Sequence, residues 1–245
     1  MKTLYADGIS FSYVTNGKKL SWINFNFSVA KGEAVSIIGS SGIGKSTLMR
    51  VLSGLHKYET GCVYIDDKKN VVRQPYSPIF IVFQDYNLTL LPWLSIENNI
   101  NLGLYKSKNN NNPTINETLK LLFPNIGNYQ DFLKTYPDQL SGGQKQRIQI
   151  ARALISNSEF LFFDEPDTGI DYKHKILLRK ILLKLVGKNK GIILITHDLE
   201  NAYELSNRFY VIHKSADTNT INLIEFKREE FCSLDEFRKK VISYI

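Results

Sequence analysis

The sequence predicts an α/β fold with a mostly parallel sheet, an N-terminal antiparallel β portion and an inserted α-helical subdomain. Apolar runs of strand length alternate with segments of helical periodicity in both outer parts of the chain, which favours a parallel sheet covered on two faces. A polar residue directly follows four of these runs: Gly39, Gln84, Asp164 and His197. Because ligands bind beyond the carboxyl ends of strands in such sheets, we expect these four residues to converge on one site.

The first part of the chain predicts strands that lead into a loop and a helix. Apolar residues alternate with serines over residues 9–13, the period-2 pattern of a strand with one buried face, and residues 20–29 continue as a second strand. Residues 34–38 are a short apolar run that enters a glycine-rich loop. A run of turn residues separates the following helix from the next strand, at residues 79–83. The helix itself is marked by apolar residues at helical spacing: Leu48, Val51, Leu52 and Leu55.

A helical insertion is expected over residues 85–158. Helical patterns cover residues 96–104 and 115–123, and the Asn-rich residues 106–113 between them are typical of an exposed loop. We assign all 245 residues to one domain, with a core of residues 1–84 and 159–245 around the insertion.

The α/β pattern resumes after the insertion. Residues 160–163 predict a strand, residues 175–186 a helix and residues 191–196 a further strand. Residues 233–236 have the spacing of a capping box and predict a last helix that runs toward Tyr244.

Bulk properties exclude some classes of protein. No apolar run approaches the ~18 residues that span a bilayer, and residues 1–7 lack the apolar stretch of a signal peptide. Cys62 and Cys232 are far apart without metal-ligand spacing, which suits a reducing cytosol. The net charge of +7 is compatible with polyphosphate, an anionic membrane surface or nucleic acid.

The glycine-rich loop fits the G-x-x-x-x-G-K-[ST] pattern of a phosphate-binding P-loop. In that pattern backbone N–H groups surround the β-phosphate, Lys45 reaches the β- and γ-phosphates, and Ser46 offers its hydroxyl to Mg²⁺. A Gly/Ser-rich linker is the alternative, but the strand before the loop and the helix after it disfavour that interpretation. The loop consists of Gly39, Ser40, Ser41, Gly42, Ile43, Gly44, Lys45, Ser46 and Thr47.

A second glycine loop, at Leu140 to Gln144, opens a helix predicted over residues 145–155. Ser141, Gly142 and Gly143 would offer a hydroxyl and N–H groups to an anion at a helix N-terminus. Since the P-loop already surrounds the chain's own nucleotide, the second loop is expected to serve the nucleotide of a partner chain. Together with the two carboxylates after the strand at residues 160–163, the loops indicate a nucleoside triphosphatase.

These motifs resemble the ATP-binding subunits of ATP-binding cassette (ABC) transporters, and Leu-Ser-Gly-Gly-Gln is their most family-specific element. By this resemblance Asp164 holds Mg²⁺, Glu165 polarises the water that attacks the γ-phosphate, and His197 contacts that phosphate. Gln84 reaches Mg²⁺ and the attacking water, and Tyr13 stacks on adenine. ATP and Mg²⁺ are therefore the expected ligands of an ATP-hydrolysing enzyme with a P-loop NTPase core.

Simpler interpretations of the same residues stay open. Asp164 could cap a helix, His197 could cap the helix that follows its strand, and Gln84 could be a surface residue at a strand end. Tyr13 shares a face with Ile9, so it could belong to the core.

The resemblance also implies partners. Two cassettes meet head-to-tail with ATP between the P-loop of one and the signature loop (residues 140–144) of the other. Residues 168–171 match the D-loop of that interface, although Gly169 and Ile170 depart from its usual residues. A chain without membrane helices favours an importer whose membrane permease subunits and solute-binding protein are separate, with no nucleic-acid partner. It would lie in the cytoplasm, peripheral on the cytoplasmic face of the membrane.

One segment bears on the choice of transporter. Residues 90–95, with Glu97 and Asn98, resemble the branch that imports nitrate, sulfonates and taurine. The alternatives are the ATPase of an exporter, or a soluble single-cassette ATPase such as an iron–sulfur assembly factor.

Overall fold

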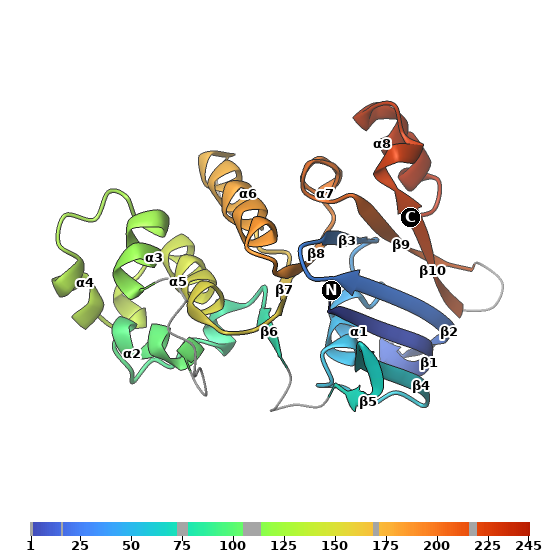
Figure 1. Cartoon of the computed structure of the whole chain (residues 1–245), viewed down its shortest axis with the longest axis horizontal. Helices are drawn as coiled ribbons and strands as arrows, with labels where there is room; N and C mark the ends of the chain where they lie inside the picture. Colours follow the sequence, from blue (N-terminus) through green and yellow to red (C-terminus); the bar gives the residue numbers. More distant parts are fainter. Residues whose placement is uncertain (1, 16, 73–77, 105–113, 169–171, 216–219) are drawn as a thin grey trace.

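A ten-stranded mixed sheet runs through the molecule, in the order β5-β4-β1-β2-β10-β9-β3-β8-β7-β6 (Figure 1). The computed structural model describes residues 2–15, 17–72, 78–104, 114–168, 172–215 and 220–245. The strands are β1 (Thr3–Thr15), β2 (Lys18–Ala30), β3 (Ala34–Ile38), β4 (Thr60–Ile65), β5 (Asp67–Val71), β6 (Ile79–Val82), β7 (Phe160–Asp164), β8 (Gly191–Thr196), β9 (Arg208–Lys214) and β10 (Thr220–Lys227).

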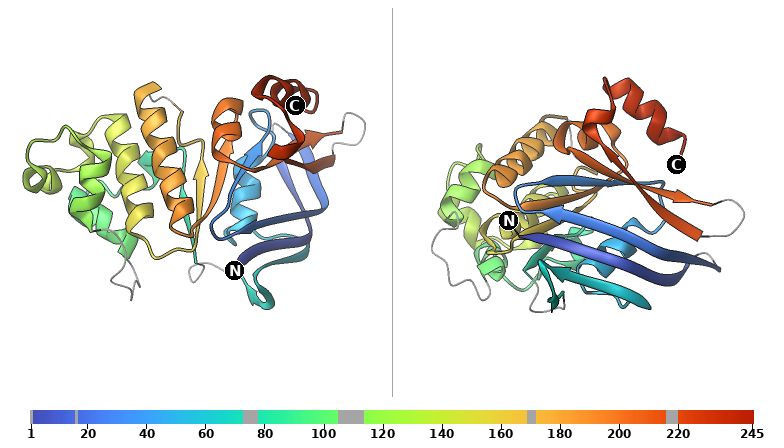
Figure 2. Two further views of the ribbon diagram at one scale, coloured as in Figure 1. Left: turned by 45° about the horizontal axis from the view of Figure 1, so that its top comes forward. Right: turned by 45° about the vertical axis from the view of Figure 1, so that its right-hand side comes forward.

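The parallel part of the sheet comprises β6, β7, β8, β3 and β9. The N-terminal strands β1 and β2 pair antiparallel, as do β1 with β4, β4 with β5, and β9 with β10. The expected α/β fold with an N-terminal antiparallel portion is therefore confirmed. The sheet curls, so that the antiparallel strands wrap around the helix of residues 45–52 (Figure 2).

One group of helices gathers at one end of the molecule, and the remaining helices lie on opposite faces of the sheet (Figure 1). Among the described residues no helix is both long and apolar enough to cross a membrane. The end group comprises α2 (Ile96–Asn101), α3 (Ile115–Leu122), α4 (Tyr129–Lys134) and α5 (Gly142–Ile155). The others are α1 (Lys45–Leu52), α6 (Tyr172–Gly187), α7 (Leu199–Leu205) and α8 (Leu234–Ile242). Short 3₁₀ turns are η1 (Tyr86–Leu88), η2 (Leu102–Leu104), η3 (Pro137–Gln139) and η4 (Arg228–Glu230).

Alternate residues of the central strands face opposite layers of core. In β7, Phe160 and Phe162 belong to the cluster around α1, whereas Leu161 and Phe163 belong to the cluster built with α5 and α6. A third cluster packs α7 and α8 on β9. Both faces of the parallel strands are thus covered, which explains why their sequences are almost continuously apolar.

Several elements differ from the sequence-based expectation. The run of turn residues after α1 contains β4 and β5, and β9, β10, α4 and α7 also had no sequence prediction. The last helix ends at Ile242, and its capping box is displaced: Ser233 accepts from the Glu236 N–H, but the Glu236 carboxylate accepts from the Cys232 N–H at 2.8 Å. The expected loop at residues 106–113 lies outside the described residues.

Candidate nucleotide-binding and hydrolysis site

Glycines shape the loop that joins β3 to α1. Gly42 and Gly44 have φ angles of 77° and 98°, a region that residues with a Cβ rarely adopt. A Cβ on Gly44 would also lie 2.2 Å from the hydroxyl oxygen of Tyr13. Gly44 caps α1 without a side-chain hydrogen bond, so the N–H groups of the first turn remain at the positive end of the helix. The loop therefore offers backbone donors to an anion.

The Lys45 side chain lies deep in this loop and is only 6% exposed. Its Nζ donates to the carbonyl oxygens of Gly39 (3.0 Å) and Ser40 (3.1 Å). The same Nζ lies 3.3 Å from Oε1 of Glu165. A nearly buried ammonium requires such compensation, and here it comes from the loop on one side and from the carboxylate after β7 on the other.

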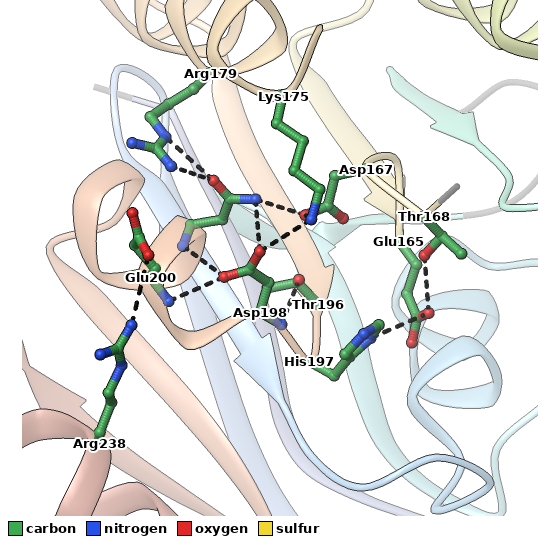
Figure 3. A network of polar contacts seen from close by, with 11 residues as sticks. Glu165, Asp167, Thr168, Lys175, Arg179, Thr196, His197, Asp198, Glu200 and Arg238 are labelled. Atoms are coloured by element: carbon green, nitrogen blue, oxygen red, sulfur yellow. Dashed lines mark hydrogen bonds and ion pairs between the residues drawn. The ribbon is translucent and has the colours of Figure 1, made fainter. Parts of the chain in front are cut away.

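Glu165 brings the predicted residues together. Its Oε2 lies 3.4 Å from Nε2 of Gln84 and 3.4 Å from Nδ1 of His197. The Thr168 hydroxyl donates to the same oxygen at 3.3 Å; Figure 3 shows the latter two contacts. The ends of β6, β7 and β8 therefore meet the P-loop at one carboxylate.

The Glu165 backbone is held in an unusual conformation. Its φ of 44° lies in the left-handed region, which costs a non-glycine residue free energy. Apart from the Asn and Asp residues that adopt it in turns, such residues cluster at functional sites. Its N–H donates to the carbonyl oxygen of Ile195 in β8 at 2.9 Å. The neighbouring strand thus fixes where the carboxylate points.

Asp164 is the last residue of β7 and is 5% exposed. Burial raises the pKa of its carboxyl, and the neighbouring Glu165 charge raises it further, against a hydrogen bond from the Ser46 hydroxyl that lowers it. Among the described residues no three acidic, His or Cys side chains cluster as a metal site. Mg²⁺ is usually held by one or two carboxylates together with substrate phosphates, so the Asp164 carboxylate beside the Ser46 hydroxyl fits this cation.

The structure decides between several of the simpler interpretations. Asp164 caps no helix, because a bend at Glu165 and a turn at Pro166 to Thr168 follow it. The N-cap of α7 is Asp198, which accepts from the N–H groups of Glu200 and Asn201, each at 3.1 Å. His197 is therefore free of a capping role, and its side chain is 59% exposed and contacts the Glu165 carboxylate.

Tyr13 has two environments. It packs against the core cluster around α1, and its hydroxyl donates to the Ile43 carbonyl oxygen at 2.7 Å. It also borders an open cavity of about 980 Å³, mouth included, with the P-loop, Gln84 and Glu165. Val14 and Thr15 line the same cavity and were not predicted; only their place next to Tyr13 could have indicated them.

The signature loop has a different setting. Ser141 caps α5: its Oγ accepts from the Gln144 N–H, and the Gln144 side chain accepts from the Ser141 N–H at 2.8 Å. The N–H groups of Gly142 and Gly143, between them, have no partner four residues earlier in the helix. These four residues do not line the cavity beside the P-loop. The D-loop residues 169–171 lie outside the described residues.

Comparison with known proteins gives a consistent family. A sequence profile of ABC transporters matches residues 23–168. An aliphatic sulfonates import ATP-binding protein of Bacillus cereus (strain ATCC 10987 / NRS 248) is 32% identical over 98% of this chain and 94% of its own length. A spermidine/putrescine import ATP-binding protein of Protochlamydia amoebophila is 34% identical over 92% of this chain and 61% of its own length.

Solved structures agree. The dimeric structure of MJ0796, a bacterial ABC transporter cassette, has a TM-score of 0.74 at 28% identity and covers 93% of this chain and 100% of that one. A dimeric post-hydrolysis state of the same cassette, bound to ADP and Pi, has a TM-score of 0.70 over the same shares of the two chains.

Proposed function

The chain belongs to the ABC transporter family as an ATP-hydrolysing subunit, and on this premise we propose that it powers the import of a small solute through separate membrane subunits. The relatives in Bacillus cereus and Protochlamydia amoebophila, both import ATP-binding proteins, support that direction. The observation that carries the proposed chemistry is the convergence of Lys45, Gln84 and His197 on Glu165.

Each residue has one task in this proposal. The P-loop N–H groups and Lys45 hold the phosphates, and Tyr13 stacks on the adenine. Glu165 accepts a proton from the attacking water, while Gln84 and His197 orient the water and the γ-phosphate. Phosphoryl transfer depends mainly on such positioning and on charge stabilisation.

Ser46 and Asp164 would hold Mg²⁺. When bound, the cation supplies positive charge that neutralises the charge on the phosphates. The raised pKa of the Asp164 carboxyl supports this, because a buried carboxylate beside a second carboxylate is stabilised by a cation.

The signature loop is proposed to act on the nucleotide of a second cassette. Its position outside the chain's own cavity supports this, as does the dimeric arrangement of the MJ0796 cassette. The N–H groups of Gly142 and Gly143 and the Ser141 hydroxyl are the donors that the partner's γ-phosphate would meet.

A docking segment for the membrane subunit is proposed at residues 91–94, in a helical subdomain of residues 85–158. Trp93 is 70% exposed there. The buried Asn99 side chain holds the segment by donating to the Leu91 and Leu94 carbonyl oxygens at 3.0 and 2.8 Å. Arg152 in turn donates to the Asn99 carbonyl oxygen at 2.6 Å. A rigidly presented indole on the surface is typical of an interaction site.

Co-purification tests the transport role. The tagged chain, extracted from membranes with detergent, should bring down a membrane protein without its own cassette, and a solute-binding protein should join the assembly. Trp93→Ala should reduce this recovery, while Ile23→Ala, which removes an exposed apolar residue of β2, should not. Recovery of an active ATPase with no membrane partner would contradict the proposal and favour a soluble cassette.

A further inference from the structure

A partly buried polar cluster lies behind the hydrolysis site, between the turn after β7, α6 and the start of α7 (Figure 3). Its centre is Asn201, which is 8% exposed. The Asn201 Nδ2 donates to Asp167 Oδ2 at 2.5 Å and to Asp198 Oδ2 at 3.2 Å. Its Oδ1 accepts from Nε and Nη2 of Arg179 at 3.2 and 2.5 Å.

The partners of Asn201 fix the orientation of its amide. A rotated amide would set its oxygen against two carboxylates and its NH₂ group against a guanidinium, which has donors only. The Lys175 Nζ lies 3.3 Å from Asp198 Oδ2 and 3.9 Å from Asp167 Oδ2. Each carboxylate is therefore compensated by the same ammonium, and Asn201 connects both carboxylates to Arg179.

The two carboxylates belong to the two segments that carry the reacting groups. Asp167 lies two residues after Glu165, in the turn that leaves β7, and Asp198 directly follows His197 at the end of β8. Asp198 is itself held, because its N–H donates to the Thr196 hydroxyl at 2.9 Å. The Asn201 side chain thus connects the Asp167 carboxylate of the Glu165 segment to the Asp198 carboxylate of the His197 segment.

We propose that Asn201 is a positioning residue for ATP hydrolysis, which keeps Glu165 and His197 at their spacing of 3.4 Å. The inference rests on the roles proposed for those two residues. Asn201 is not among the residues that line the nucleotide cavity, so its loss should lower turnover and leave nucleotide binding intact. A purely structural role would lower stability without this separation.

The test compares Asn201→Leu, which loses the side-chain bonds to both carboxylates, with Asn201→Asp, which keeps the volume but whose side chain offers the carboxylates no donor. Both variants keep the backbone N–H that donates to Asp198. Circular dichroism and thermal unfolding establish that each is folded. We expect kcat to fall roughly ten- to hundredfold, as for a displacement of about 1 Å, with the Kd for a non-hydrolysable ATP analogue within about twofold. The matched control is Glu200→Gln, on the same helix, which loses only the half-exposed ion pair with Arg238; its kcat should match wild type.

A second arm places Asn201→Leu in a His197→Ala background. Since the spacing no longer matters there, the added loss in kcat should be less than about threefold. Wild-type kcat in the folded Asn201 variants, or an equal loss in both backgrounds, would overturn the inference. Full turnover in His197→Ala alone would instead contradict the proposed role of His197, so the two failures are distinguishable.

Discussion

The Lys45–Glu165 ion pair predicts that Glu165→Gln binds ATP more tightly as well as failing to hydrolyse it. Lys45 Nζ and Glu165 Oε1 are 3.3 Å apart, and the two side chains are only 6% and 13% exposed. Bound phosphates must therefore compete with Glu165 for the ammonium. The amide of a glutamine keeps the shape of the side chain but removes the competing charge.

The size of the effect follows from the geometry. Coulomb's law gives about 5 kcal/mol for unit charges at this distance with an effective dielectric constant of about 20. Most of this is offset, because the pair is partly solvated and Lys45 keeps its bonds to the Gly39 and Ser40 carbonyl oxygens. We expect about 1–2 kcal/mol to remain, which corresponds to a five- to thirtyfold decrease in Kd.

The assay is equilibrium binding of a fluorescent ATP analogue, measured in a Ser141→Arg background so that dimerisation does not add to the affinity. Thr168→Val is the control: it also removes a contact of Glu165, yet it leaves the Lys45 ion pair in place. An unchanged or weaker affinity in Glu165→Gln would refute the reasoning.

Three further predictions concern binding, assembly and stability. Lys45→Ala should abolish hydrolysis mainly by weakening phosphate binding, and an ATP turnover equal to wild type would contradict this. Glu165→Gln should accumulate as an ATP-bound dimer in size-exclusion chromatography, and adding Ser141→Arg should return it to a monomer that still binds ATP; an undiminished dimer would count against the role of the signature loop. Burial alone would raise the pKa of Asp198, but the Asn201 N–H and Lys175 outweigh it and hold the pKa below its ordinary value. The Asp198 charge therefore stabilises the fold at pH values above the ordinary pKa of an aspartate, and this stabilisation is lost as the pH falls through the depressed pKa. The Tm of Asp198→Asn should accordingly change less on acidification than the Tm of wild type.

Strands with a continuous apolar sequence could be predicted closely. Residues 34–38 and 191–196 have the predicted bounds, because both faces of those strands are buried and turn residues flank them. By contrast, β5 has the sequence Asp-Lys-Lys-Asn-Val, which has low strand propensity. It exists because β4 supplies its hydrogen-bonding partner, and Asp66 before it accepts from the Thr3 N–H at 2.7 Å. Tertiary pairing of this kind leaves no local pattern.

The residues of the site also differ in whether the sequence could predict them. The P-loop and the signature loop are continuous segments in which spacing determines chemistry, so their residues could be named from the sequence. Asn201 is different, because its partner Asp167 is 34 residues away and only the packing of α7 against the turn after β7 brings them together. An asparagine in the first turn of a helix has no distinguishing pattern of its own.

The register of the sheet is what turns these separate motifs into one site. Asp164 pairs with Ile195 across β7 and β8, and the Ile195 carbonyl oxygen accepts the N–H of Glu165, whose φ is positive. His197 is two residues beyond Ile195, so one strand both holds the Glu165 backbone in its unusual conformation and presents His197 to its carboxylate. A slip of one residue between β7 and β8 would turn the side chains to opposite faces. The apolar residues that fix this register, such as Phe162 and Ile193, therefore determine the geometry of hydrolysis as directly as the polar residues do.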